Sequence, residues 1–176
     1  MRRPSILATA LVAVTLCGPL RAQQTDLPNR TLEQRFLRGS YLSVSTWVAS
    51  IAYAKSMGQT PEDFGRWVGK LYAPSWSGLR GQGPQAVVRG MHRNFTTYDG
   101  AVMEIVEASE SSITVRANRP YIGFYFGDDL QSRGVTVEEY EQVFQVMNEE
   151  ICQYLEFTCK QRVEEGWVVT TIAVKE

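Results

Sequence analysis

Residues 135–155 (VTVEEYEQVFQVMNEEICQYL) carry the strongest local signal in the chain, because they predict a long helix with a defined start. Thr136 and Glu139 match a capping box, in which each side chain accepts a hydrogen bond from a backbone N–H that the helix leaves unpaired. Val135 and Tyr140 add a hydrophobic staple across the same turn. Apolar residues then recur at three- and four-residue steps, which predicts one buried helix face. This face comprises Tyr140, Val143, Phe144, Met147, Ile151 and Leu155.

A pair of strands is predicted on each side of this helix. Residues 156–163 and 167–174 follow it and indicate a C-terminal hairpin with its turn at Gly166. Residues 101–108 (AVMEIVEA) and 112–117 (SITVRA) precede it and indicate an earlier hairpin.

Two helices are predicted near the N-terminus. The first begins at Thr31 with a second capping box and ends at Gly58. The second begins at Thr60-Pro61, where Thr caps and Pro suits the first helical position. We expect one buried face on each helix. The first face comprises Phe36, Leu37, Tyr41, Val44, Trp47, Val48 and Ile51, and the second Phe64, Trp67, Val68 and Leu71.

The fold class follows from the order of these segments. After a glycine-rich loop at 73–83, a short helix is predicted over 84–94, followed by two strands, the capped helix and two more strands. This order predicts an α+β fold, with N-terminal helices packed on one face of an antiparallel sheet of about four strands. The capped helix lies between the two hairpins. We expect residues 31–176 to form a single domain after a flexible lead-in at 23–30.

The first 22 residues predict a secretory signal peptide. Met1-Arg2-Arg3 is basic, an uncharged stretch over 6–16 follows, and cleavage is expected after Ala22. The apolar stretch is shorter than the ~20 residues that span a bilayer. An uncleaved anchor and a lipoprotein signal at Cys17 are the alternatives. The mature protein is expected to be soluble and periplasmic or secreted.

The charge of the mature chain bears on its partners. Cleavage leaves 15 basic and 19 acidic residues, a net charge of −4, with no cluster of Lys or Arg. Nucleic acids and anionic lipids are bound by basic patches, so neither is an expected partner. No cofactor is expected, and the sequence does not decide whether the chain forms a homo-oligomer.

Two cysteines remain after cleavage, Cys152 and Cys159. An even number in an exported protein favours a disulfide. Two buried thiols are the alternative, because buried Cys packs as a small hydrophobe. His92 is the only histidine. With Cys159 as nucleophile and His92 as base, a hydrolase is one hypothesis. The two cysteines and His92 do not have the spacing of metal ligands, so no metal site is expected.

Two further motifs have a plain structural interpretation. Gly78, Gly81 and Gly83 lie beside Arg80, but the spacing matches no phosphate-binding motif and favours a loop. Asp128-Asp129 lacks the alternating ligands of a calcium loop and favours a solvated turn.

The segment 118–134 is irregular, and its first half is unusually aromatic. Its aromatic side chains cannot all be buried by strand alternation, so some of them are expected to line a pocket or to plug one end of the sheet. Trp76 in the glycine-rich loop is a candidate lid. The predicted ligand-binding residues are Arg119, Tyr121, Phe124, Tyr125, Phe126 and Trp76.

The layout over 84–174 resembles a known group of domains. The element order and the helix–Cys152–strand–Cys159–Gly166 pattern are similar to the 4-vinyl-reductase-type and TRAPP-related domains, and to the L-2-amino-thiazoline-4-carboxylate hydrolase family. The resemblance implies a hydrophobic small-molecule pocket between helices and sheet. No catalytic signature of these families is matched, so the resemblance assigns no residue a role.

The leading hypothesis from sequence is an exported, non-catalytic domain that binds a small, mostly apolar molecule. A protein–protein interaction module of the cell envelope, with the same aromatic residues exposed, is the second hypothesis. The hydrolase using His92 and Cys159 is the third.

Overall fold

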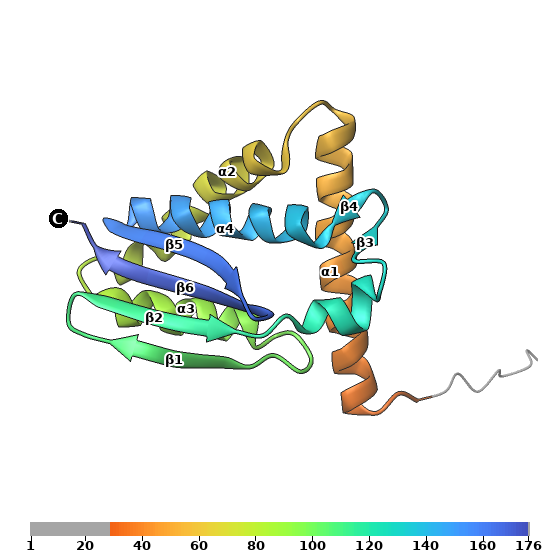
Figure 1. Cartoon of the computed structure of the whole chain (residues 1–176), viewed down its shortest axis with the longest axis horizontal. Coiled ribbons are helices and arrows are strands. Elements are labelled where there is room, and N and C mark those ends of the chain that lie inside the picture. The colour runs from red at the N-terminus through yellow and green to blue at the C-terminus, as the bar shows by residue number, and fades with distance from the viewer. Residues whose placement is uncertain (1–28, 176) are drawn as a thin grey trace, which may run out of the picture.

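The computed structural model describes residues 29–175 and confirms the α+β fold class (Figure 1). Its elements are α1 (Leu32–Ser56), α2 (Pro61–Tyr72), the 3-10 helix η1 (Ala73–Leu79), α3 (Pro84–Phe95), β1 (Met103–Ala108), β2 (Ser112–Ala117), the π-helix η2 (Ile122–Phe126), β3 (Gln131–Ser132), β4 (Val135–Thr136), α4 (Val137–Tyr154), β5 (Phe157–Glu164) and β6 (Trp167–Val174).

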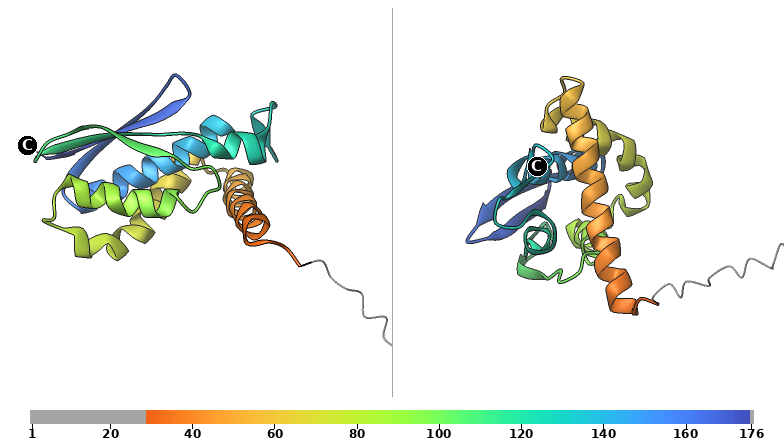
Figure 2. Two further views of the ribbon diagram at one scale, coloured as in Figure 1. Left: turned by 90° about the horizontal axis from the view of Figure 1, so that it is seen from below. Right: turned by 90° about the vertical axis from the view of Figure 1, so that its right-hand side faces the viewer.

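The four long strands form one antiparallel sheet in the order β1-β2-β6-β5. The two predicted hairpins therefore meet along β2 and β6. Helices α3 and α4 lie on one face of this sheet, and α1 crosses its end (Figure 2). We call the face toward α3 and α4 the inner face.

The predicted helix starts are confirmed in atomic detail. Thr31 and Thr136 each cap their helix through a complete capping box, and Thr60 does the same with Asp63. Val135 and Tyr140, the two residues of the predicted staple, are buried. The local sequence alone determines these features, because every partner lies within five residues.

The predicted buried face of α2 is confirmed for Val68, which is 3% exposed, and for Phe64, which packs against a core cluster. It is wrong for Trp67 and Leu71, which are 60% and 59% exposed, because Gly65 and Gly69 face α4 instead. A methyl group added at Gly69 would lie 2.6 Å from Cβ of Glu150 on α4. The two glycines let the helix backbones approach closely, and this contact sets the rotation of α2.

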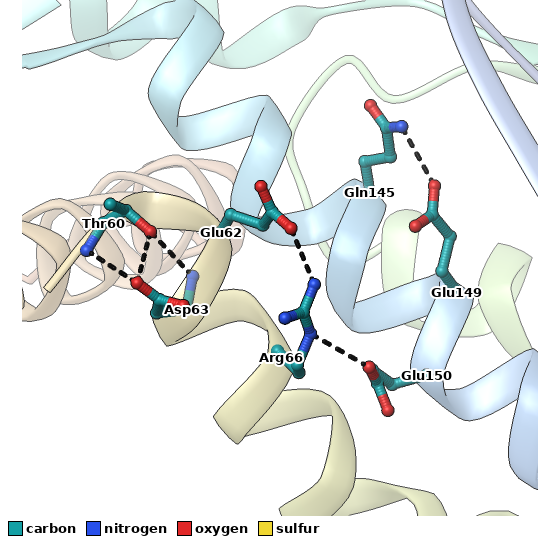
Figure 3. Close-up of polar contacts among 7 residues, drawn as sticks. All are labelled: Thr60, Glu62, Asp63, Arg66, Gln145, Glu149 and Glu150. Atoms are coloured by element: carbon teal, nitrogen blue, oxygen red, sulfur yellow. Dashed lines mark hydrogen bonds and ion pairs between the residues drawn. The ribbon is translucent and has the colours of Figure 1, made fainter.

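Polar side chains flank the close contact between α2 and α4 (Figure 3). Arg66 of α2 donates to Glu62 one turn earlier and forms an ion pair with Glu150 of α4 at 3.4 Å. The capping pair Thr60 and Asp63 lies at the start of the same helix. Arg66 thus links α2 to α4 at the edge of the glycine contact.

The predicted buried face of α1 is confirmed only in its second half. Val44, Val48 and Ile51 are fully buried, whereas Phe36 and Leu37 are each 43% exposed. The helix extends past the body of the domain at its N-terminal end (Figure 1). Those first turns have too few neighbours to bury their apolar side chains.

Two segments expected to be irregular contain short ordered elements. The glycine-rich segment begins with η1, and the aromatic segment contains η2 and the short strand β3, which pairs with β4 directly after the segment. Both segments are therefore more ordered than their composition predicts.

The described residues contain no helix that is both long and apolar enough to cross a membrane. The signal peptide predicted at 1–22 and most of the lead-in predicted at 23–30 lie outside the described residues. Both stay predictions.

Candidate functional site

A cavity of about 500 Å³ lies between the inner face of the sheet and the helices. Side chains from α1, η1, α3, α4 and all four strands of the main sheet line it. Members of two separate core clusters contribute to its wall: one is built on the sheet, α3 and the end of α4, and the other on α1, η2 and the start of α4. The cavity therefore lies where the two cores meet.

The inner face of the sheet has two different halves. The packed half is the cross-strand row Ile113, Ile172 and Cys159, which packs in a hydrophobic core cluster and does not line the cavity. The hollow half is the next two rows toward α1, and its members form the cavity floor. They are Val115, Thr170 and Gln161 in one row, and Ala117 and Val168 in the other.

Large aromatic side chains form the walls above this floor. Trp47 of α1 meets Phe144 of α4 edge-to-face, with ring centroids 5.0 Å apart. Trp76 of η1 packs on Gly90 of α3, where an added methyl group would lie 2.5 Å from its ring. Flat, rigid rings of this kind give a cavity a defined shape and an affinity for apolar ligands.

Glu141 is the single charged side chain among the described residues that line the cavity. Its carboxylate is only 9% exposed and accepts hydrogen bonds from Arg119 Nε at 2.5 Å and from a second guanidinium nitrogen at 2.9 Å. The Tyr121 hydroxyl donates to the same carboxylate at 2.6 Å. This paired, bidentate arrangement neutralises the charge at the wall, so the cavity presents no free charge to a ligand.

The pKa shifts of Tyr121 and Arg119 support the conclusion that the Glu141 charge is neutralised. Burial raises the pKa of Tyr121 far above its usual range, and the adjacent Glu141 charge raises it further. Burial disfavours the charged form of Arg119, but the hydrogen bond and charge of Glu141 outweigh it, so the pKa of Arg119 is raised. The tyrosine stays neutral and the arginine stays charged at every physiological pH.

A second polar feature on the cavity wall is a pair of tyrosine hydroxyls. Tyr98, in the turn after α3, and Tyr140 of α4 bring their hydroxyl oxygens to 3.3 Å. The Tyr140 ring is fixed by packing on Tyr121 and Phe144, with centroids 5.1 and 4.8 Å away. Burial raises the pKa of Tyr140 well above its usual value, so its hydroxyl keeps its proton.

The structure brings only some of the predicted ligand-binding residues to the cavity. Tyr121 and Trp76 line it, and Arg119 lies one contact behind Glu141. Phe124, Tyr125 and Phe126 are not among its lining residues.

Phe126 is a buried member of the core cluster that includes α1, and Phe124 and Tyr125 are partly buried and pack against that cluster. Tyr125 contacts Tyr41 of α1 with ring centroids 5.0 Å apart, and Phe126 contacts Tyr140 at 5.5 Å. Their contacts are thus with α1 and α4.

Several lining residues escaped prediction as a site. Phe144 and Met147 were predicted only as part of the apolar face of α4, and Trp47 only as part of that of α1. Tyr98 lies in a turn and gives no periodic signal. These residues come together only through the tertiary fold, so no local pattern could have grouped them.

The disulfide considered from sequence is not formed in the structure, where Cys152 and Cys159 are free thiols. Cys152 is completely buried on α4 and packs with Ile151 and Leu155, as expected for its alternative role as a small hydrophobe. A hydrogen bond with Cys159 and burial raise the pKa of the Cys152 thiol.

The imagined catalytic pair is not assembled among residues 29–175. His92 is exposed on α3, and no hydrogen bond joins its side chain to Cys159 on β5. Neither residue lines the cavity. No group of three His, Cys, Asp or Glu side chains within the described range could hold a metal ion.

The two further motifs take plain structural roles. Gly81 and Gly83 occupy positive-φ positions between η1 and α3, and Asp128-Asp129 lies in an exposed turn after η2.

Comparisons with known proteins assign no family. No family model matches the chain, and no curated protein matches it. Among solved structures, the crystal structure of an Fe(II) unliganded H-NOX protein from K. algicida aligns at a TM-score of 0.28 and 8% identity. The alignment covers 84% of this chain and 65% of that one, so the chain spans about two thirds of that protein's length. A similarity this low assigns neither a fold nor a function.

Proposed function

We propose that this chain is an exported, non-catalytic protein that binds one uncharged, largely apolar small molecule in the cavity over the hollow half of the sheet. The observation that carries the proposal is the cavity itself. Its volume of about 500 Å³ falls within the usual range of ligand sites, its walls are rich in aromatic rings, and the one charged side chain that lines it within residues 29–175 is neutralised.

A role without catalysis is proposed because His92 and Cys159, the one nucleophile–base pair that the sequence offers, lie outside this cavity. Export is proposed from the predicted signal peptide.

The interaction-module hypothesis required an exposed aromatic patch over residues 121–126. Tyr121 and Phe126 are only 6% and 5% exposed, so these side chains are not available to a partner protein. Exposed apolar side chains lie elsewhere among the described residues, near the start of α1 (Phe36, Leu42), on α2 (Trp67, Leu71) and on β1 (Ile105, Val106).

Two fluorescent probes that differ by one charged group test the proposal. N-phenyl-1-naphthylamine is neutral, whereas 8-anilino-1-naphthalenesulfonate carries a sulfonate on the same N-phenylnaphthylamine skeleton. We expect the neutral probe to bind saturably with one site per chain. The anionic probe should bind about tenfold more weakly or worse, because its charge would be buried without a partner.

A cavity-filling variant locates the binding. Ala117 lies on the cavity floor and is 8% exposed, so Ala117→Phe places a ring inside the cavity. We expect it to weaken binding of the neutral probe by about tenfold or more. Ala173→Phe, on the opposite face of the same sheet, is the matched control and should bind as the wild type does. Equal probe binding by both variants would contradict the proposed site.

A further inference from the structure

The polar features of the cavity are unequal in what they can offer a ligand. The Glu141 carboxylate is occupied by three hydrogen bonds from Arg119 and Tyr121. The Asn118 side chain is also occupied, because it accepts from the Val102 N–H and donates to the Gly100 carbonyl. Neither group has its main hydrogen-bonding capacity free.

The hydroxyl pair of Tyr98 and Tyr140 is different. Two hydroxyls carry two protons, and the single hydrogen bond between them uses one. Neither hydroxyl donates to any other group within the described part of the chain, so one proton has no acceptor there. Tyr140 is 2% exposed, Tyr98 is partly buried, and both residues line the cavity, so a ligand bound there can supply that acceptor.

We propose that Tyr98 and Tyr140 recognise an oxygen acceptor, a carbonyl or an ether, on the uncharged ligand of this cavity. The inference rests on the proposed function and names the polar group of its ligand. The aromatic walls hold the apolar body of the molecule, while the spare hydroxyl proton selects those molecules that carry an acceptor at the right place.

The packing of Tyr140 makes this donor a fixed one. Its ring contacts Tyr121, Phe126 and Phe144, so its hydroxyl is held at one place in the wall. A donor that is already oriented loses little conformational freedom when a ligand binds.

Competition between two matched compounds tests the inference. 2-Acetylnaphthalene and 2-ethylnaphthalene have the same ring and nearly the same shape, but only the first has a carbonyl. Each is used to displace N-phenyl-1-naphthylamine from the full chain, and the ratio of the two competing affinities is the readout. The two compounds differ in general hydrophobicity, and this difference cancels when the ratio for one protein variant is compared with the ratio for another.

We expect the double variant Tyr98→Phe/Tyr140→Phe to lower this ratio by roughly threefold to tenfold, the effect of one net hydrogen bond. Each single variant keeps one hydroxyl and should lower the ratio less. Tyr53→Phe, an exposed tyrosine of α1 outside the cavity, is the control and should leave the ratio unchanged.

The outcomes separate the two proposals. If the neutral probe binds but the double variant keeps the wild-type ratio, the oxygen-acceptor inference is overturned and the cavity proposal stands. If the probe does not bind the wild type, the cavity proposal itself fails. The infrared carbonyl stretch of bound 2-acetylnaphthalene gives a second readout. We expect a shift to lower frequency in the wild type, and a carbonyl that is free of hydrogen bonds in the wild type would overturn the inference.

Discussion

The packed half and the hollow half of the inner sheet face lie side by side on the same strands, yet they are built differently. In the packed half, two isoleucines, Ile113 and Ile172, extend from the sheet into a core that is completed by α3 and the end of α4. In the hollow half, the corresponding positions hold Val115, Ala117 and Thr170, which are shorter or polar.

The difference shows where stability and binding reside. Interiors normally fill their space closely, so the rows of large residues are expected to contribute most of the folding energy. Short floor residues beneath large aromatic walls leave room for a ligand. The hollow half therefore has the composition of a site rather than of an ordinary core.

The largest expected effect comes from the ion pair of Arg119 and Glu141, which lies at the wall of the cavity. Arg119→Met leaves the buried Glu141 carboxylate unpaired, which should cost about 3 kcal/mol of unfolding free energy. Adding Glu141→Gln removes that charge and keeps an acceptor for Tyr121, so the double variant should regain more than half of the loss. Urea unfolding of both variants measures this. A single variant as stable as the wild type would show that the pair is not buried in solution.

The next effect compares the two halves directly. Ile172→Ala in the packed half should cost about 3 kcal/mol, because it removes a fully buried side chain and leaves a new void. Val168→Ala in the hollow half should cost less than about 1 kcal/mol, because its side chain already borders open space. The midpoints of urea unfolding measure the stability of both variants. Equal losses of stability would contradict the distinction between the packed half and the hollow half.

The smallest effect concerns the attachment of α1, which forms the end wall of the hollow half. Glu139 of α4 accepts hydrogen bonds from Lys55 of α1 and from the Thr136 N–H. Burial opposes the charged form of Glu139, but these hydrogen bonds outweigh it and lower its pKa below the usual value.

A carboxylate with a lowered pKa stabilises the fold above its unfolded pKa, and this contribution disappears as the pH falls through the folded pKa. Glu139→Gln should therefore lower stability at neutral pH by about 1 kcal/mol or less. It should also reduce the loss of stability on acidification below about pH 4.3. Urea unfolding at pH 7 and at pH 3 measures this, and an unchanged pH profile would show that the contact with Lys55 is not maintained.

Much of the fold could be predicted from the sequence because its signals are local. The capping boxes at Thr31 and Thr136 involve partners three residues apart, and the strands alternate over a few residues. The α2 face was predicted correctly for Val68 but wrongly for Trp67 and Leu71, because apolar periodicity takes no account of glycine. At Gly65 and Gly69 the absence of a side chain creates the contact with α4.

The candidate site was predictable only in part. Tyr121 and Trp76 stood out by composition, but Trp47, Tyr98 and Phe144 come from three distant segments. The aromatic residues after Tyr121 suggested a pocket and instead secure α1. Composition therefore showed that the domain is rich in aromatic side chains, while the tertiary fold determined which of them line the cavity.

The most direct test of the ligand cavity is a crystal structure of the full chain with bound N-phenyl-1-naphthylamine. We predict that the probe lies over Val115 and Thr170, between Trp47 and Met147. Finding the probe instead on the exposed apolar side chains at the start of α1, with the cavity over the hollow half filled only by water, would contradict the proposed function.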